Sequence, residues 1–272
     1  MAANLPPPRQ VLAHAHWTMA NAKMSKSRGN VADPLEIMRR PGGVGVNGLR
    51  WYLMRNGGAL GNDADYSGEE LVKGYTLLAS RMGNLVGRIG SGKIQKRFLA
   101  AAESAGMLGT PLQEAPERSL WEMLHGLKAR LETRLDRHEI TSAMQDVMEV
   151  ILEVRSSPFF RASHANTSQA NRLFTLLQPW TATTPPADLL TALTYAHDSL
   201  RLAGIALGPV MPSKMPDLLD RLGVEQRGWD ELDRVGDVAR VRTCVERMVE
   251  GSKSGKREVL FPPLAESGAA GV

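Results

Sequence analysis

Two lysines three positions apart are the residues of this sequence best placed for chemistry. They lie in the run Lys23-Met24-Ser25-Lys26-Ser27, with Gly29 close behind. Lysine ammonium groups neutralise phosphates as point charges, and electrostatic catalysis contributes most where charge develops, as on a departing pyrophosphate. The pattern therefore suits a mobile cationic loop that closes over a nucleotide triphosphate. Lys-x-x-Lys by itself also occurs in ordinary solvated turns, and alone it favours that plainer interpretation.

The residues before this loop predict a strand, and those after it predict a short helix. The stretch 10–19 is apolar and aromatic without a helical stripe. A single strand is not stable alone, so we expect it to pair with strands that this chain need not contain. Asp33 is a good N-cap and Pro34 suits the first helical position, so a helix should run to Arg40. The segment 45–55 is compatible with helix or strand, because its glycines weaken a helix by roughly 1 kcal/mol each.

A second set of candidate residues lies on a long amphipathic helix. Ser67 and Glu70 have the spacing of a capping box, which predicts a helix over about 68–88. The apolar stripe of this helix consists of Leu71, Tyr75, Leu78, Met82 and Leu85. At about 100° per residue, Asn84 and Arg88 fall on the opposite face, one turn apart and near Arg81. Without other information, an ordinary polar face is the favoured explanation for them over a binding site.

The stretch 87–94 resembles a phosphate-binding loop but does not qualify as one. It has the glycine spacing and a lysine, yet Ile94 stands where a metal-binding Ser or Thr belongs, and a helix precedes it in place of a strand. We therefore expect these glycines to end the helix and turn the chain.

The rest of the chain reads as helices separated by polar or Pro/Gly-rich segments. Apolar stripes predict helices near 120–135, 140–154, 171–177, 189–207, 213–222 and 238–249, with linkers at 100–117 and 156–168, an extended segment at 259–262 and a frayed tail at 263–272. This many amphipathic helices favour an antiparallel bundle. Trp180 follows Pro179, which should place it at a helix end, where the indole could cap the core or offer a stacking face.

Composition limits the possible classes. The chain has 272 residues, 43% of them hydrophobic and only 5% aromatic, which is typical of one large or two modest domains built mainly from helices. A net charge of +4 permits an anionic partner such as RNA without demanding one. Cys244 is the single cysteine, which excludes an intrachain disulfide and a cysteine-based zinc site and favours a reducing compartment. No apolar run of about 18 residues is present, so we expect no membrane span.

Taken in order, these motifs resemble the methionyl-tRNA synthetase family. Lys-Met-Ser-Lys-Ser is the signature loop of class I aminoacyl-tRNA synthetases, and the other similar strings narrow the match. Those strings are His14-Ala15-His16-Trp17-Thr18, Gly29-Asn30-Val31-Ala32-Asp33-Pro34, Asp63-Ala64-Asp65-Tyr66-Ser67, Gly83-Asn84-Leu85-Val86-Gly87-Arg88, Asn171 with Gln178-Pro179-Trp180, Val210-Met211-Pro212 and Leu260-Phe261-Pro262.

The resemblance implies a fold and a division into parts. Residues 1–27 would be a remnant of the Rossmann-type catalytic domain with the signature loop, and 28–66 a small α/β stem-contact region. Residues 67–272 would be a mainly α, antiparallel helix bundle that binds the anticodon. The implied activity is that of a methionine-tRNA ligase, which uses ATP with its Mg²⁺, methionine and tRNA(Met) in protein synthesis.

The resemblance also assigns roles to the candidate residues. Lys23 and Lys26 would stabilise the ATP phosphates within an ATP-binding loop completed by Met24, Ser25 and Ser27, while the methionine carboxylate attacks the α-phosphate. Asn84 would read base edges, Arg88 would bind base or backbone, and Trp180 would stack a base of the CAU anticodon, in the manner of proteins that read single-stranded loops.

Some family features are not in this sequence. The His-Ile-Gly-His motif, the methionine pocket and the zinc-bearing insertion belong upstream of the loop, so we expect a truncated product without zinc that is inactive alone. Asn47-Gly48 replaces the usual Asp-Ala, which should weaken the helix there. Gly-Ser-Gly-Lys after Arg88 and the lack of an appended tRNA-binding domain favour the mitochondrial branch of the family. We therefore expect the protein in the mitochondrial matrix, with the cytoplasm as the alternative. We also expect it to be a monomer.

Two other interpretations stay open at this stage. One is a different class I synthetase, for isoleucine, valine, leucine or cysteine, since these share the loop and a helical anticodon domain. The other is a non-catalytic, helical tRNA-binding protein that keeps a relic of the loop. Dependence of RNA binding on the CAU anticodon, and affinity for ATP, would separate these interpretations.

Overall fold

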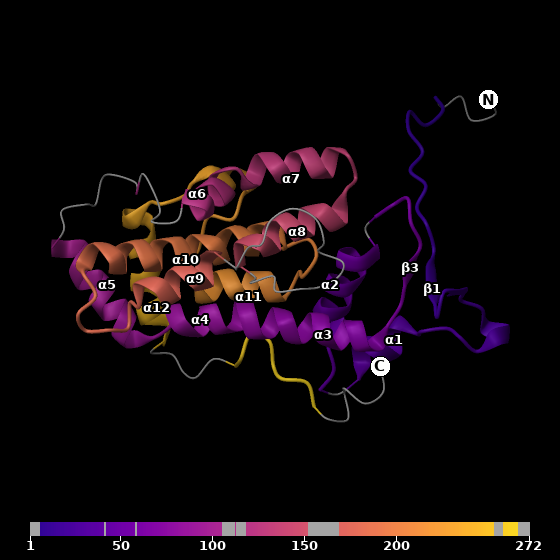
Figure 1. The fold of residues 1–272 in the computed structure, drawn as a ribbon, viewed down its shortest axis with the longest axis horizontal. Coiled ribbons are helices and arrows are strands. Elements are labelled where there is room, and N and C mark those ends of the chain that lie inside the picture. The colour runs from indigo at the N-terminus through magenta and orange to yellow at the C-terminus, as the bar shows by residue number, and fades with distance from the viewer. Residues whose placement is uncertain are drawn as a thin grey trace.

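The structure, a computed structural model, describes residues 6–40, 42–57, 59–104, 112, 118–151, 169–252 and 258–265. Helices dominate it, with one small sheet at the N-terminal end (Figure 1). The predicted loop 156–168, residues 266–272 of the predicted tail, and most of the predicted linker 100–117 lie outside the described residues. The start of that linker was wrong, because 100–104 are helical.

The sheet has three short strands in the order β2-β1-β3, with bounds Trp17–Met19 (β1), Ala22–Lys23 (β2) and Ala64–Asp65 (β3). β1 pairs antiparallel with β2 and parallel with β3. The predicted strand over 10–19 was therefore too long, and both strands that pair with β1 belong to this chain. Residues 6–14 lie exposed, as Val11 does with 80% of its surface accessible, and form no strand.

Two helices follow the lysine loop. In α1 (Pro34–Arg39) the predicted cap is confirmed, because the Asp33 carboxylate accepts a 2.8 Å hydrogen bond from the Leu35 amide. The segment that could have been helix or strand is a helix, α2 (Gly45–Gly57). It forms despite its glycines because one face is buried, with Leu49 and Trp51 almost inaccessible to solvent.

The predicted helix over 68–88 is present, with one correction. It consists of α3 (Gly68–Leu78), a π-helical turn η2 (Ala79–Gly83) and α4 (Asn84–Ile89). The Ser67 hydroxyl accepts a hydrogen bond from the Glu70 amide at 3.3 Å, as expected of a capping box. The Glu70 carboxylate pairs instead with Lys73 at 3.2 Å.

The middle of the chain forms α5 (Gly92–Ser104), α6 (Arg118–His125), α7 (Leu127–Asp136), α8 (Ile140–Ile151) and α9 (Gln169–Leu177). Within the stretch 87–94 the chain turns at Gly90 and Ser91, between the end of α4 and the start of α5, in agreement with its rejection as a phosphate loop. The single helix predicted over 120–135 is two helices, which meet at Gly126.

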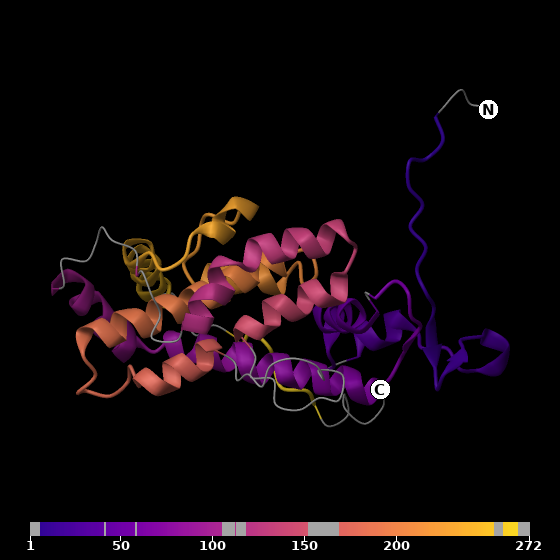
Figure 2. The same ribbon diagram turned by 45° about the horizontal axis from the view of Figure 1, so that its top comes forward.

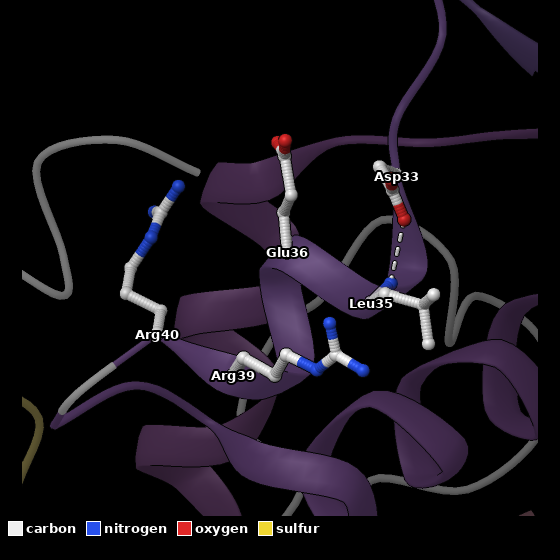
Figure 3. Close-up of a pocket in the computed structure, with 5 residues that line it drawn as sticks. All are labelled: Asp33, Leu35, Glu36, Arg39 and Arg40. Atoms are coloured by element: carbon white, nitrogen blue, oxygen red, sulfur yellow. Dashed lines mark hydrogen bonds between the residues drawn. The ribbon is translucent and has the colours of Figure 1, made fainter.

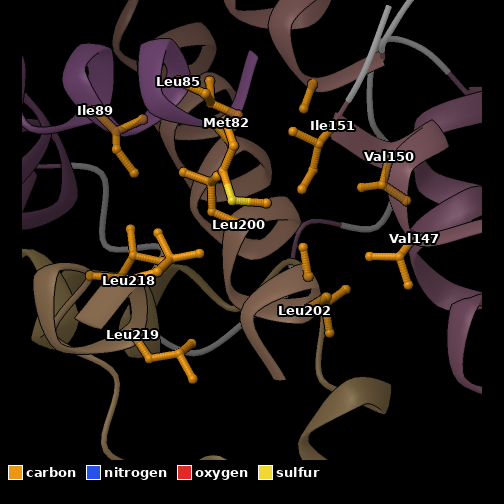
Figure 4. Close-up of a cluster of buried hydrophobic side chains, with 14 of the residues drawn as sticks. Met82, Leu85, Ile89, Val147, Val150, Ile151, Leu200, Leu202, Leu218 and Leu219 are labelled. Atoms are coloured by element: carbon orange, nitrogen blue, oxygen red, sulfur yellow. The ribbon is translucent and has the colours of Figure 1, made fainter. Parts of the chain in front are cut away.

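The C-terminal part contains α10 (Pro186–Ala206), α11 (Lys214–Arg221), the 3₁₀ turn η4 (Trp229–Asp233) and α12 (Val238–Ser252). α10 is the centre of the packing, in contact with α4, α5, α8, α9, α11 and α12 (Figure 2). Figure 4 shows side chains of α4, α8, α10 and α11 meeting in this core. The sequence predicted one apolar stripe here, but α10 is buried on nearly all sides, including Asp198 and Arg201.

The buried charges of α10 are paired. The Asp198 carboxylate accepts hydrogen bonds from Arg201 at 3.2 Å and from Arg240 of α12 at 2.6 Å, and its other oxygen accepts from the Gly236 amide at 2.8 Å. These bonds fasten the segment around η4 to α10 and α12. Removing one member of such a buried pair leaves an uncompensated charge and is strongly destabilising.

Candidate functional site

A tight hairpin presents the lysine loop. Ala20 and Asn21 join β1 to β2 with φ values of 53° and 57°, as in a two-residue turn with a left-handed backbone at both central positions. The Asp65 carboxylate accepts hydrogen bonds from the Thr18 hydroxyl at 2.6 Å and from the Asn21 amide at 2.8 Å. These bonds, the one from Thr18 most of all, lower the pKa of Asp65. β3 thus fixes the turn that leads into the loop.

The loop itself is a closed unit. Lys23 ends β2, and Lys26 begins the 3₁₀ turn η1 (Lys26–Arg28). The side-chain amide of Asn30 bridges the base of the loop, donating to the Lys23 carbonyl at 3.2 Å and accepting from the Ser25 amide at 2.9 Å. Gly29 makes this return possible with a φ of 68°.

The two lysine heads have no carboxylate partner among the described residues, and both side chains are exposed. The Ser25 and Ser27 hydroxyls lie 2.8 Å apart and hydrogen-bond to each other, while Met24 is half-buried. The loop therefore presents two uncompensated positive charges on a backbone that is closed by Asn30. Asn30 belongs to one of the sequence motifs, but its role could not be predicted, because an amide bridge across a loop is visible only in three dimensions.

The second candidate site lies in the helical part, away from the sheet (Figure 1). The Arg88 guanidinium donates to the Thr175 hydroxyl of α9 at 3.2 Å, and its carbon lies 5.7 Å from the centroid of the Trp180 ring. A cation at this distance from an indole is attracted by the ring quadrupole. Asn84 is exposed one turn before Arg88 on α4. The fold thus brings Arg88 and Trp180 together, and places Asn84 nearby on the same helix.

Trp180 lies between the two alternatives that the sequence left open. Its ring packs against buried Phe174, with centroids 6.1 Å apart and planes inclined by 42°. At the same time 39% of the residue is exposed. The indole therefore rests on the edge of the core and still has surface on which a planar ligand could stack.

The π-helical turn η2 ends directly before Asn84. Such turns insert an extra residue into a helix, change the direction of the side chains that follow, and occur frequently at functional sites. The hydrophobic stripe alone did not predict this turn, since Leu78, Met82 and Leu85 continue the apolar spacing through it and are all buried.

A surface pocket of about 450 Å³ lies beside α1 (Figure 3). Its lining consists of Asp33, Leu35, Glu36, Arg39 and Arg40. The two acidic and two basic side chains point in different directions, so the pocket has no single charge that would select a cation or an anion. It contains none of the candidate residues.

Among the described residues, no three His, Cys, Asp or Glu side chains lie close enough together to hold a metal ion. None of the described helices combines the length and apolar character needed to cross a bilayer.

Comparison with known proteins relates the chain to one family. Residues 1–90 match the family model described as tRNA synthetases class I (M). The chain is 34% identical over 231 residues to a probable mitochondrial methionine–tRNA ligase of Neurospora crassa, covering 83% of this chain and 34% of that protein. It is 31% identical over 282 residues to the mitochondrial methionine–tRNA ligase of Bos taurus, covering 98% of this chain and 44% of that protein.

A solved structure gives the same relationship. Mycobacterium tuberculosis methionyl-tRNA synthetase in complex with methionyl-adenylate matches with a TM-score of 0.61 and 25% identity, covering 86% of this chain and 43% of that one. The chain therefore spans less than half the length of each of these relatives.

Proposed function

Because this chain belongs to the methionyl-tRNA synthetase family, we propose that it supplies the lysine loop and the anticodon-reading surface of a methionine-tRNA ligase. The ligase reaction converts ATP, methionine and tRNA(Met) to methionyl-tRNA, AMP and pyrophosphate. The observation that carries the proposal is the contact of half-buried Arg88 with the partly exposed Trp180 indole, with exposed Asn84 one turn away on α4. In this proposal 1–27 belongs to the catalytic domain, 28–66 is the stem-contact region and 67–272 is an antiparallel anticodon-binding bundle.

The lysine loop has the charge that the first half-reaction needs. The methionine carboxylate attacks the α-phosphate of ATP, the bond to the β-phosphate breaks, and pyrophosphate leaves with the bonding electrons. No base is required, because the carboxylate is already ionised. Lys23 and Lys26, both exposed, would stabilise the charge that accumulates on the leaving group. We assign the larger share to Lys26 and expect the Mg²⁺ to arrive with ATP.

Three side chains would read the anticodon. The Trp180 indole would stack one base, which is typically worth about 1–3 kcal/mol. The Asn84 amide, with both a donor and an acceptor, would bind base edges, and Arg88 would bind a base or the backbone. α4 carries Asn84 and Arg88, and α9 leads into the loop with Trp180; both helices pack on α10, the centre of the packing.

Binding of RNA hairpins tests this proposal. The chain should bind a hairpin with the anticodon arm of tRNA(Met) more tightly than one with the same stem and a replaced CAU. Trp180→Ala and Asn84→Ala should weaken binding and reduce that preference, whereas Trp229→Ala, the same change at a distant indole, should not. Equal binding of both hairpins would point to a non-specific tRNA-binding protein, and a preference for another anticodon to another class I synthetase.

The location that we propose is the mitochondrial matrix, because the Neurospora and bovine relatives are named as mitochondrial enzymes. Bacterial methionine–tRNA ligases also match this chain, so the matrix location follows from those two names and not from the family as a whole. Recovery of the protein only in the cytoplasm after cell fractionation would contradict it. We further propose that the protein acts as a monomer, which light scattering in solution would test.

A further inference from the structure

Arg97 of α5 binds the backbone of the loop that carries Trp180. Its Nη1 donates to the carbonyl oxygens of Pro179 and Thr181, each at 2.7 Å. Its Nη2 reaches the carbonyls of Ala182 and Thr184 at 3.5 and 3.4 Å, the long end of the hydrogen-bond range. One guanidinium thus gathers four carbonyls from six consecutive residues of a loop.

The loop depends on such bonds because it contains no helix or strand. It begins at Gln178, whose φ of 44° turns the chain sharply after α9. The Thr184 hydroxyl closes it by donating to the Gln178 carbonyl at 2.7 Å. The carbonyls therefore point inward to Arg97, while the indole of Trp180, partly exposed, lies against Arg88.

The guanidinium of Arg97 hydrogen-bonds to backbone carbonyls and to no acidic side chain among the described residues. No carboxylate in the described part of the chain pairs with it, and its guanidinium is half-buried under the loop. A lysine could not replace it, because an ammonium is a compact charge with three donors, whereas guanidinium offers a planar fork of five. Arg97 is thus suited to ordering the backbone of the Trp180 loop, and the carbonyls of that loop already accept its hydrogen bonds.

We propose that Arg97 is a positioning residue for anticodon recognition: it fixes the Trp180 loop so that the indole is held ready to stack a base. This inference rests on the proposed function. A stacking surface that is already ordered loses less conformational entropy on binding, which increases affinity. Arg97 contributes through Trp180 and does not itself contact the RNA.

Binding of the CAU hairpin by substituted proteins tests the role. Trp180→Ala should weaken binding roughly 5- to 150-fold, the ratio that corresponds to about 1–3 kcal/mol for one stacked base. Arg97→Lys should weaken it about fivefold or more, without exceeding the Trp180→Ala loss, although the charge is kept. Arg97→Gln should also lose affinity. Lys96→Ala, which removes an exposed charge from the next position of α5, is the matched control and should have a small effect.

A combined variant shows whether Arg97 acts through Trp180. If it does, Trp180→Ala with Arg97→Lys should bind as Trp180→Ala alone does, because the indole that Arg97 positions is gone. If the losses of the two single variants add in the combined variant, the proposal is overturned. It is also overturned if Arg97→Lys binds as the wild type does while Arg97→Gln binds weakly, because that result would mean that only the charge of Arg97 matters. If Trp180→Ala itself binds normally, the proposed function fails, and this inference with it.

A spectroscopic measurement without RNA separates positioning from general instability. In protein labelled with fluorotryptophan, the ¹⁹F resonance of Trp180 can be assigned from Trp180→Phe. Arg97→Lys should shift or broaden that resonance and leave those of Trp17, Trp51, Trp121 and Trp229 in place. An unchanged Trp180 resonance would overturn the proposal, and so would equal changes in all five.

Discussion

The guanidinium carbon of Arg88 lies 5.7 Å from the centroid of the Trp180 indole, although the two residues are far apart in the sequence. Arg88 is in α4, and Trp180 follows α9. They meet because both helices pack on α10. The candidate RNA surface is therefore a product of helix packing, and its parts can be tested one residue at a time.

Arg88→Gln should weaken binding of the CAU hairpin by about 1–3 kcal/mol and narrow its preference over a hairpin with a replaced anticodon, as expected for loss of a base contact. Titrations at several salt concentrations measure both effects. An unchanged preference, with a salt slope reduced by about one, would assign Arg88 to the RNA backbone instead. Lys73→Gln, at an exposed lysine of α3 that pairs with Glu69, is the control for lost charge.

Asn30→Ala should loosen the lysine loop, because its amide bridges Lys23 and Ser25 across the base of the loop. A hydrogen bond of about 0.5–1.5 kcal/mol corresponds to a change of up to about tenfold in local opening. Hydrogen exchange of the Ser25 amide and trypsin cleavage after Lys23 and Lys26 should both accelerate. Asn30→Asp keeps the acceptor for Ser25 and should have an intermediate effect; identical rates in all three proteins would contradict the bridge.

Stability should fall in acid partly because of His197, which is fully buried in α10 and contacts the Leu222 carbonyl at 3.0 Å. Burial lowers the pKa of His197 to about 4 from its usual 6.5. The unfolded chain therefore takes up a proton as pH falls below 6.5, while the folded protein resists protonation until about pH 4. The contribution is fully present at neutral pH and is lost across that window, amounting to about 3 kcal/mol.

Urea unfolding at pH 7 and near pH 4 measures this loss. His197→Gln cannot titrate, so its free energy of unfolding should decrease less between the two pH values than that of the wild type. Carboxylates that also titrate in this range contribute equally to both proteins, so their effect cancels in the comparison. Equal decreases would show that His197 does not contribute to acid sensitivity.

Gly48→Ala should destabilise the protein although alanine is the better helix former by about 1 kcal/mol. A β-carbon at position 48 would lie 2.8 Å from the Val44 β-carbon and 2.9 Å from Cδ2 of Tyr75, whose hydroxyl is held by the Pro262 carbonyl at 2.9 Å. Overpacking of this kind costs about 1–3 kcal/mol. Gly87→Ala in α4, where a β-carbon would meet no atom within 4 Å, is the matched control and should be neutral or stabilising by thermal unfolding.

Asn47 and Gly48 also make contacts that the sequence could not reveal. The Asn47 side chain donates to the Ser213 hydroxyl at 2.6 Å and accepts from the backbone amides at the start of α11. It thus ties α2 to the C-terminal helices. Gly48 lets Tyr75 pack closely against α2. Contacts across the fold explain both residues, whereas helix propensity explained neither.

Features that depend on neighbouring residues could be predicted from the amino-acid sequence. The periodic stripe over 68–88 predicted a helical run there, Asp33 and Ser67 predicted helix starts, and the order of motifs predicted the family. These predictions succeed because helical hydrogen bonds and helix caps join residues only a few positions apart in the sequence. The lysine loop was visible for the same reason, since both lysines lie within one turn of chain.

How distant segments meet is visible only in the three-dimensional structure. It paired β1 with β3 of the same chain, buried α10 on nearly all sides, left Trp180 at the edge of the core, and placed Arg97 under its loop. None of these follows from local periodicity. The free energy of burial and of long-range hydrogen bonds depends on which faces come together, and that choice is made by the packing of the whole chain.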